Sequence, residues 1–265
     1  MGESYRSVRR TTSILEALAR NPAGLDLGGV AVETGLDRST AYRFLKSLVD
    51  VGVMRQVAGG KYQLSWKMYE IGTSLLLSQG IDLKAIYPVL ERLSSITGQS
   101  SNMAVMDNHE VIYVAAVNSQ GIVQTVFRVG GRLPAYCTAL GKAILSQWSP
   151  DEARRYVSST EFQRYTDNTI LDKNRFLKEL EDARARCYAV QSQEIVGGVH
   201  CMAAPLFNMF DEPFASVGIS GHSAAFLATP AMAREVISSA RQLSQYFGAP
   251  RERLSYFDRS LETLG

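Results

Sequence analysis

The sequence predicts an α+β fold in which a small winged helix-turn-helix precedes a larger domain built on an antiparallel sheet. Between Leu25 and Leu64, two helix-like segments flank a glycine turn and lead into two short strand-like segments. From about residue 100 onward, strand-like and helix-like stretches follow one another with short loops between them. With 265 residues, 46% of them hydrophobic, the chain is long enough to bury two cores.

The helices of the N-terminal module are predicted in order. Apolar residues at helical spacing predict a first helix over about 8–19 and a second over about 28–34. The N-terminus of the second helix is expected to be only weakly stabilised, because Gly28 and the next glycine stand where a Ser or Thr cap would be better. Gly35 can take the positive φ of a sharp turn, and Asp37 is a good N-cap for the third helix.

The third helix has two faces when its residues are placed at about 100° intervals from Arg38. One side is apolar and would face a core: Ala41, Phe44, Leu45 and Leu48. The other side carries cations, hydroxyls and one aromatic ring: Arg38, Ser39, Tyr42, Arg43 and Lys46. A core-packed helix with such an outer face has what a reader of the DNA major groove needs. Many basic amphipathic helices are simply solvated, so the interpretation depends on the turn before this helix and the hairpin after it.

A hairpin follows the third helix. Residues 53–57 are apolar enough for a strand, 58–60 (Ala-Gly-Gly) form a turn, and 61–64 return. Cations on its two arms are expected to meet phosphates or the neighbouring minor groove. The predicted contacts with double-stranded operator DNA are Arg38, Ser39, Thr40, Tyr42, Arg43, Lys46, Arg55 and Lys61.

The distribution of charge agrees with this assignment. Residues 1–64 carry nine cations and six anions, whereas the rest of the chain carries 19 cations and 20 anions. A mildly basic small domain beside a nearly neutral large one suits binding to DNA.

Other features of the composition exclude several classes. The N-terminus lacks the apolar core of a signal peptide, and no run approaches 18 apolar residues, so we expect a cytoplasmic protein without membrane contact. The three cysteines, Cys137, Cys187 and Cys201, suit reduced cytosolic thiols. No Cys or His pair has zinc-ligand spacing, and we expect neither a metal site nor a cofactor.

The predicted domains are a winged helix-turn-helix at 1–66, a linker helix at 67–81 and a second domain at 82–265. In the second domain, helices are expected at about 83–96, 138–147, 150–157, 173–186 and 230–247. Strands are expected at about 101–106, 111–117, 123–129, 188–193, 199–207 and 214–220.

The order of these parts resembles the IclR family of bacterial transcriptional regulators over nearly the whole chain. The matching segments are SVRRTTSILEAL at 7–18, TGLDRSTAYRFLKSLVDVG at 34–52, YQL at 62–64, GRLPAYCTALGKAIL at 131–145, EIVGGVHCMAAPLFN at 194–208 and EPFASVGISG at 212–221. The resemblance implies a GAF-like effector-binding domain and a repressor controlled by a small organic effector, acting as a homodimer or a dimer of dimers. Two positions depart from the family pattern: Gly28 replaces a hydroxyl cap, and Cys187 stands where a glycine is common.

The resemblance also implies an effector site. The loop LPAYCTALGK would form one wall, where backbone N–H groups at a helix start could receive a carboxylate. The alternative is that Gly141 merely permits close packing, and that Cys201 is a buried core thiol. The implied effector contacts are Ile122, Thr125, Leu133, Ala139, Leu140, Gly141, Gln191, Val199, Cys201 and Ser220.

The sequence bears on three other functions. Gly141-Lys142 does not fit a phosphate loop, because Tyr136 and Ala143 stand where that pattern needs Gly and Ser or Thr. A cysteine hydrolase is disfavoured because His200 and Cys201 are adjacent and would diverge on a strand. A redox sensor that uses the three thiols, without any small-molecule effector, remains an alternative to the effector-controlled regulator.

Overall fold

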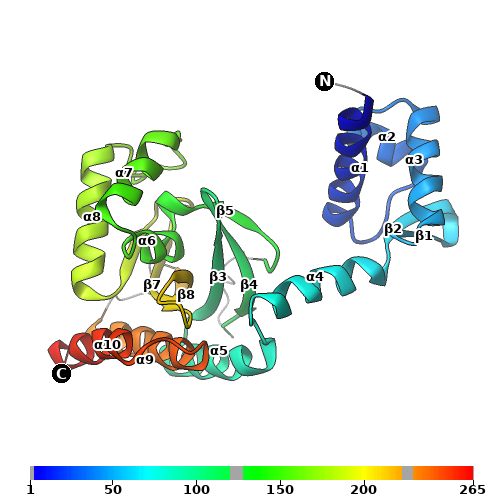
Figure 1. Ribbon diagram of the computed structural model, residues 1–265. Coiled ribbons are helices and arrows are strands. Elements are labelled where there is room, and N and C mark those ends of the chain that lie inside the picture. Colours follow the sequence, from blue (N-terminus) through cyan, green and yellow to red (C-terminus); the bar gives the residue numbers. More distant parts are fainter. Residues whose placement is uncertain (1–2, 120–127, 223–228, 265) are drawn as a thin grey trace. The chain divides into compact units, whose positions relative to one another are not determined.

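The computed structural model describes residues 3–119, 128–222 and 229–264. They form two compact units, Met1–Ile81 and Asp82–Gly265 (Figure 1). The helix that was predicted as a linker at 67–81 clusters with the first unit. Each unit has its own hydrophobic core, so each is described separately.

The first unit is a winged helix-turn-helix, as predicted. Its elements are α1 (Glu3–Arg20), α2 (Leu27–Thr34), α3 (Arg38–Asp50), β1 (Met54–Val57), the 3-10 turn η1 (Ala58–Gly60), β2 (Lys61–Leu64) and α4 (Trp66–Ser78). The two strands pair antiparallel, and Tyr62 of β2 also exchanges backbone hydrogen bonds with Leu25. The core gathers apolar side chains from α1, α2, α3 and the hairpin, including Ile14, Val30, Leu45 and Met54.

Side-chain caps define the helix-turn-helix. Gly35 ends α2 in the left-handed conformation, with φ 67°, and the Asp37 carboxylate caps α3 by accepting a hydrogen bond from the N–H of Thr40 at 2.9 Å. The prediction that the N-terminus of α2 is only weakly stabilised was wrong. The helix begins at Leu27, and Asp26 caps it by accepting a hydrogen bond from the Gly29 N–H at 2.7 Å.

The second unit is built on one six-stranded antiparallel sheet with the order β5-β4-β3-β8-β7-β6. Its strands are β3 (Ser100–Asp107), β4 (Glu110–Val117), β5 (Arg132–Pro134), β6 (Ala189–Ser192), β7 (Val199–Phe207) and β8 (Pro213–His222). Its helices are α5 (Leu83–Thr97), α6 (Ala139–Leu145), α7 (Pro150–Ser159), α8 (Lys173–Arg186), α9 (Pro230–Tyr246) and α10 (Arg251–Thr263), with the 3-10 turn η2 (Ala135–Cys137) before α6. The predicted strand at 123–129 lies mostly outside the described residues, and β5 and α10 were not predicted.

Helices cover both faces of the sheet (Figure 1). One face packs against α5 and α9, and the other packs against α6 with α7 and α8 beside it. Alternate residues of each strand point to opposite faces. The Ser101 hydroxyl donates to the Leu90 carbonyl of α5, at 2.7 Å, whereas the Ser216 hydroxyl donates to the Leu140 carbonyl of α6, at 2.9 Å.

Helix α6 sits unusually close to the turn that precedes it. A Cβ atom placed on Gly141 would lie only 2.3 Å from the carbonyl oxygen of Ala135. The structure therefore favours the packing role for this glycine.

We expect Gly141→Ala to destabilise the second unit by about 1–3 kcal/mol, because the backbone of Ala135 cannot yield as a flexible side chain could. Gly72→Ala is the matched control, since Gly72 is also helical and a Cβ there would meet nothing within 4 Å. In urea unfolding, the control should be neutral or stabilising because alanine is the better helix former. Equal free energies of unfolding for the two variants would contradict the packing role.

Candidate functional site

Most of the predicted DNA contacts are exposed side chains of the first unit. Exposed side chains from α3 and the hairpin are Arg38, Ser39, Tyr42, Arg43, Lys46, Arg55 and Lys61. Thr40 does not share this exposure, because only 7% of it is accessible on the core side of α3. On the hairpin, Arg55 Nη2 donates to Gln63 Oε1 across the two strands at 3.1 Å.

The start of α3 is held by Asp37. The Ser39 hydroxyl donates to Asp37 Oδ1 at 2.6 Å, and this bond together with the Thr40 N–H holds the pKa of Asp37 well below its ordinary value. The carboxylate therefore stays ionised as a helix cap at all ordinary pH values.

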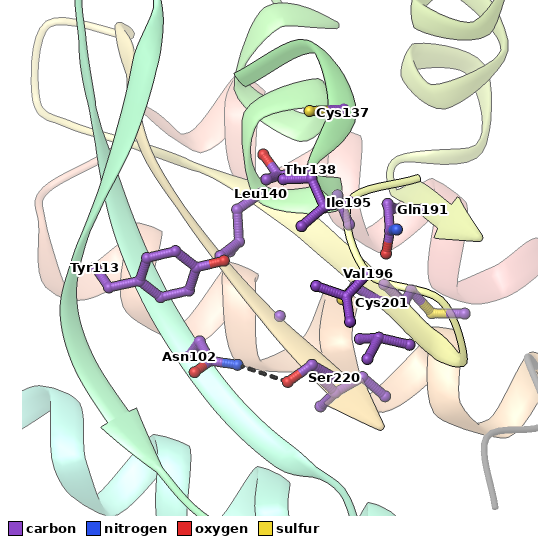
Figure 2. Close-up of a pocket in the computed structure, with 15 residues that line it drawn as sticks. Asn102, Tyr113, Cys137, Thr138, Leu140, Gln191, Ile195, Val196, Cys201 and Ser220 are labelled. Carbon is purple, nitrogen blue, oxygen red and sulfur yellow. Dashed lines mark hydrogen bonds between the residues drawn. The ribbon is translucent and has the colours of Figure 1, made fainter. Parts of the chain in front are cut away.

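In the second unit, the strand register brings three predicted residues together. Gln191 on β6 is directly opposite Cys201 on β7, and Cys201 is directly opposite Ser220 on β8. Directly opposed residues share a face of the sheet. Figure 2 shows this face, on which Asn102 of β3 extends the row by donating from Nδ2 to Ser220 Oγ at 3.1 Å.

This face forms the floor of a pocket, and the start of α6 and the β6–β7 connection form its walls (Figure 2). We call it the sheet pocket. Its cavity volume is only about 20 Å³, room for about one water molecule. Its lining comprises Asn102, Tyr113, Cys137, Thr138, Ala139, Leu140, Gln191, Ile195, Val196, Val199, Cys201, Met202, Gly218, Ile219 and Ser220.

Six of the ten implied effector contacts lie in this lining: Ala139, Leu140, Gln191, Val199, Cys201 and Ser220. Gly141 does not, because it packs against Ala135 and its N–H donates to the capping hydroxyl of Thr138 at 3.0 Å. Leu133 does not either, since β5 forms one edge of the sheet and β6 forms the opposite edge. Ile122 and Thr125 lie outside the described residues.

The structure adds polar lining residues that the sequence analysis missed. Asn102 and Tyr113 come from β3 and β4, and they reach the pocket face from the side opposite Gln191 (Figure 2). Burial raises the pKa of Tyr113 well above its ordinary value, so the phenol is neutral. The available signal for Asn102 was an amide directly before the apolar run 103–106 of β3.

A buried ion pair lies behind the pocket wall. Lys142 of α6 donates to Glu194 Oε1, and the two side chains are 1% and 6% exposed. Glu194 lies in the connection between β6 and β7. The next two residues of this connection, Ile195 and Val196, line the pocket. Burial raises the pKa of Glu194, and the charge of Lys142 opposes that effect.

Hydrogen bonds fix the same connection on its other sides. The hydroxyls of Thr166 and Thr169 donate to the carbonyls of Gln193 and Glu194, both at 2.6 Å. With the amide of Gln191 oriented to satisfy its surroundings, its oxygen accepts from the N–H groups of Glu194 and Gln193 at 2.5 and 3.1 Å. That orientation leaves the NH₂ group of Gln191 as the donor for other partners.

The three thiols are protonated at neutral pH, and a protonated thiol is a poor nucleophile. Burial raises the pKa of Cys137, Cys187 and Cys201 to about 12. Cys187 ends α8 in the left-handed conformation, with φ 67°, so it fills a tight turn that glycine would fill more easily. Cys201 lines the sheet pocket as an uncharged, apolar side chain.

Two classes of feature are not seen in the described parts of the chain. Residues 3–119, 128–222 and 229–264 contain no group of three or more His, Cys, Asp or Glu side chains placed to hold a metal ion. Within the same ranges, no helix is both long and apolar enough to span a bilayer.

Comparison with known families decides the assignment. The model for the C-terminal domain of the bacterial transcriptional regulator IclR matches residues 76–245, and the IclR helix-turn-helix model matches residues 7–58. The chain belongs to the IclR family. It is a DNA-binding transcriptional regulator, which confirms the predicted resemblance, and the family consists of regulators rather than enzymes.

Individual relatives agree with this assignment. The transcriptional repressor IclR of Escherichia coli (strain K12) is 30% identical over 219 residues, which cover 82% of this chain and 80% of that protein. A crystal structure from Rhodococcus sp. RHA1 is 28% identical and has a TM-score of 0.74, covering 98% of this chain and 99% of that chain. An IclR homologue from Microbacterium hydrocarbonoxydans, complexed with 4-hydroxybenzoate, shares the fold with a TM-score of 0.80 at 19% identity, over 91% and 98% of the two chains.

The raised pKa values give a direct test of the thiols. At pH 7 we expect each thiolate fraction to be roughly 1,000-fold below that of an ordinary cysteine, because each pKa unit is a factor of ten. Alkylation by iodoacetamide, followed by mass spectrometry, should therefore be slow in the folded protein and fast in urea. Rapid modification of the folded protein at pH 7, or DNA binding that is lost on mild oxidation, would contradict the expectation that the thiols are unreactive. Either result would support the redox-sensor alternative.

Proposed function

We propose that this regulator is a cytoplasmic repressor whose binding to operator DNA is controlled by a small organic acid in the sheet pocket. The observation that carries the proposal is the convergence of Gln191, Cys201 and Ser220, from three adjacent strands, on one pocket. A concave site with apolar walls and a few converging polar groups is the usual form of a small-molecule site. Relatives named as repressors, in Escherichia coli and Salmonella typhimurium, support the sign of regulation.

The lining favours a compact acid bound by neutral donors. None of the described lining residues is charged, and the nearby Lys142–Glu194 pair is internally neutralised. The NH₂ group of Gln191 and the hydroxyl of Ser220 would hold a carboxylate, while Ile195 and Val196 would contact its apolar part. The complex of the Microbacterium hydrocarbonoxydans homologue with 4-hydroxybenzoate supports an aromatic acid as one candidate.

DNA would be bound through the exposed face of α3 and through the hairpin. Phosphate contacts set position, and side chains on α3 would read base edges in the major groove. The proposed contacts are Arg38, Ser39, Tyr42, Arg43, Lys46, Arg55 and Lys61. Thr40 would contribute mainly through the start of α3, because its side chain is buried.

The DNA-binding form we propose is a homodimer, or a dimer of dimers, because one recognition helix reads too few base pairs for an operator. Helix α4 supports this. It has no buried residue, and large apolar side chains are exposed around it: Trp66, Tyr69, Ile71, Leu75 and Leu77. A helix that is apolar on several sides is normally buried, so a second copy of the chain would cover α4.

The pocket can be blocked without removing a buried polar group. We expect Cys201→Leu to fill the sheet pocket while keeping the fold, because the site already has apolar neighbours. A duplex would first be selected from random DNA by the wild-type protein. Acids, including 4-hydroxybenzoate and central-metabolic acids, would be screened by thermal shift under reducing conditions.

Cys201→Leu should bind the selected duplex about as tightly as wild type but need at least about tenfold more acid for release. Cys187→Ala is the matched control, because Cys187 lies outside the pocket lining, and it should respond normally. The proposal is wrong if Cys201→Leu keeps the wild-type response, or if no acid in the panel alters melting or DNA affinity.

A further inference from the structure

A groove between α1 and α3 gathers cations beside the predicted reading face. Arg6 and Arg10 on α1 and Arg43 on α3 line it, and Phe44 and Leu48 are among its apolar residues. The groove has a volume of about 530 Å³. Because Arg43 belongs to the exposed face of α3, the groove is continuous with the surface proposed to meet DNA.

Among the described side chains, no carboxylate lies within ion-pair distance of these three cations. All ion pairs between described side chains lie in the unit Asp82–Gly265, and none involves Arg6, Arg10 or Arg43. Arg6 and Arg10 are also one helical turn apart on α1, where like charges repel each other. An arrangement of this kind is unfavourable by itself and becomes favourable when an anion enters between the side chains.

We propose that this groove binds phosphodiester groups of the DNA backbone that borders the major groove occupied by α3. The proposal rests on the DNA-binding function and extends its contact surface to α1. Guanidinium groups match the geometry of phosphate oxygens, and the groove places them beside the helix that reads bases. Its role is to position α3 without reading sequence. Arg43 then contacts a phosphate together with α1.

This assignment was not visible in the sequence analysis, where α1 was recognised only by its apolar spacing. Arg6 and Arg10 acquire their role because α1 and α3 share one core and border the same groove, which also contains Arg43. Arg9 differs from its neighbours, since its guanidinium lies over the Tyr5 ring at 5.9 Å from the centroid.

The test is the salt dependence of binding to a random-sequence duplex. The double variant Arg6→Ala/Arg10→Ala should lower the slope of log affinity against log salt by about two, because each lost phosphate contact removes about 0.9. Its affinity should fall by the same factor for random DNA and for a duplex selected by the wild-type protein, since phosphates carry no sequence information. Arg6→Lys/Arg10→Lys should retain most of the slope.

Arg20→Ala is the matched control, because Arg20 is an exposed cation in the last turn of α1 and does not line the groove. Circular dichroism would verify that α1 is intact in each variant. The proposal is overturned if Arg20→Ala lowers the slope as much as the double variant, or if the double variant keeps the wild-type slope. A wild-type protein that binds no DNA would instead contradict the DNA-binding function itself.

Discussion

The sheet pocket depends on the buried ion pair between Lys142 and Glu194. Neither charge can be left alone in a nonpolar interior, because an unpaired buried charge costs several kcal/mol. Their pairing therefore ties the connection between β6 and β7 to helix α6. Ile195 and Val196, which follow Glu194 in the chain, are held against the pocket as a consequence. The same pairing keeps net charge away from a lining that consists of apolar groups, amides and hydroxyls.

Strand register supplies the other half of the site. Gln191, Cys201 and Ser220 meet because β6, β7 and β8 pair at one register, and a slip of one residue would turn one of them to the opposite face. That opposite face packs against α5 and α9. The sheet thus separates a face for packing from a face for binding. The first unit makes a comparable division on α3, whose apolar side joins a core and whose basic side is exposed.

Features with a local physical cause could be predicted from the sequence. Gly35 and Asp37 have their effect within one turn, and the turn and cap form as expected. Asp26 acts just as locally but was missed, because the start of α2 was placed after it. Leu133 lies on β5, at the edge of the sheet opposite β6, and strand order is not written in the spacing of residues along the chain. The Lys142–Glu194 pair joins residues that are 52 positions apart, which no local pattern reveals.

The dependence of the sheet pocket on the Lys142–Glu194 ion pair is tested most directly by the alkylation rate of Cys201 in the variant Glu194→Gln. This substitution removes one charge of the pair with little change in shape. If the pair holds the pocket wall, we expect Cys201 to react at least about tenfold faster than in wild type, as local opening costs less free energy. Cys187, which lies outside the pocket, should react as slowly as before. Glu179→Gln, which breaks the more exposed pair with Arg186, should change neither rate. An unchanged rate at Cys201, or an equal rise at Cys201 and Cys187, would contradict a local role for the ion pair.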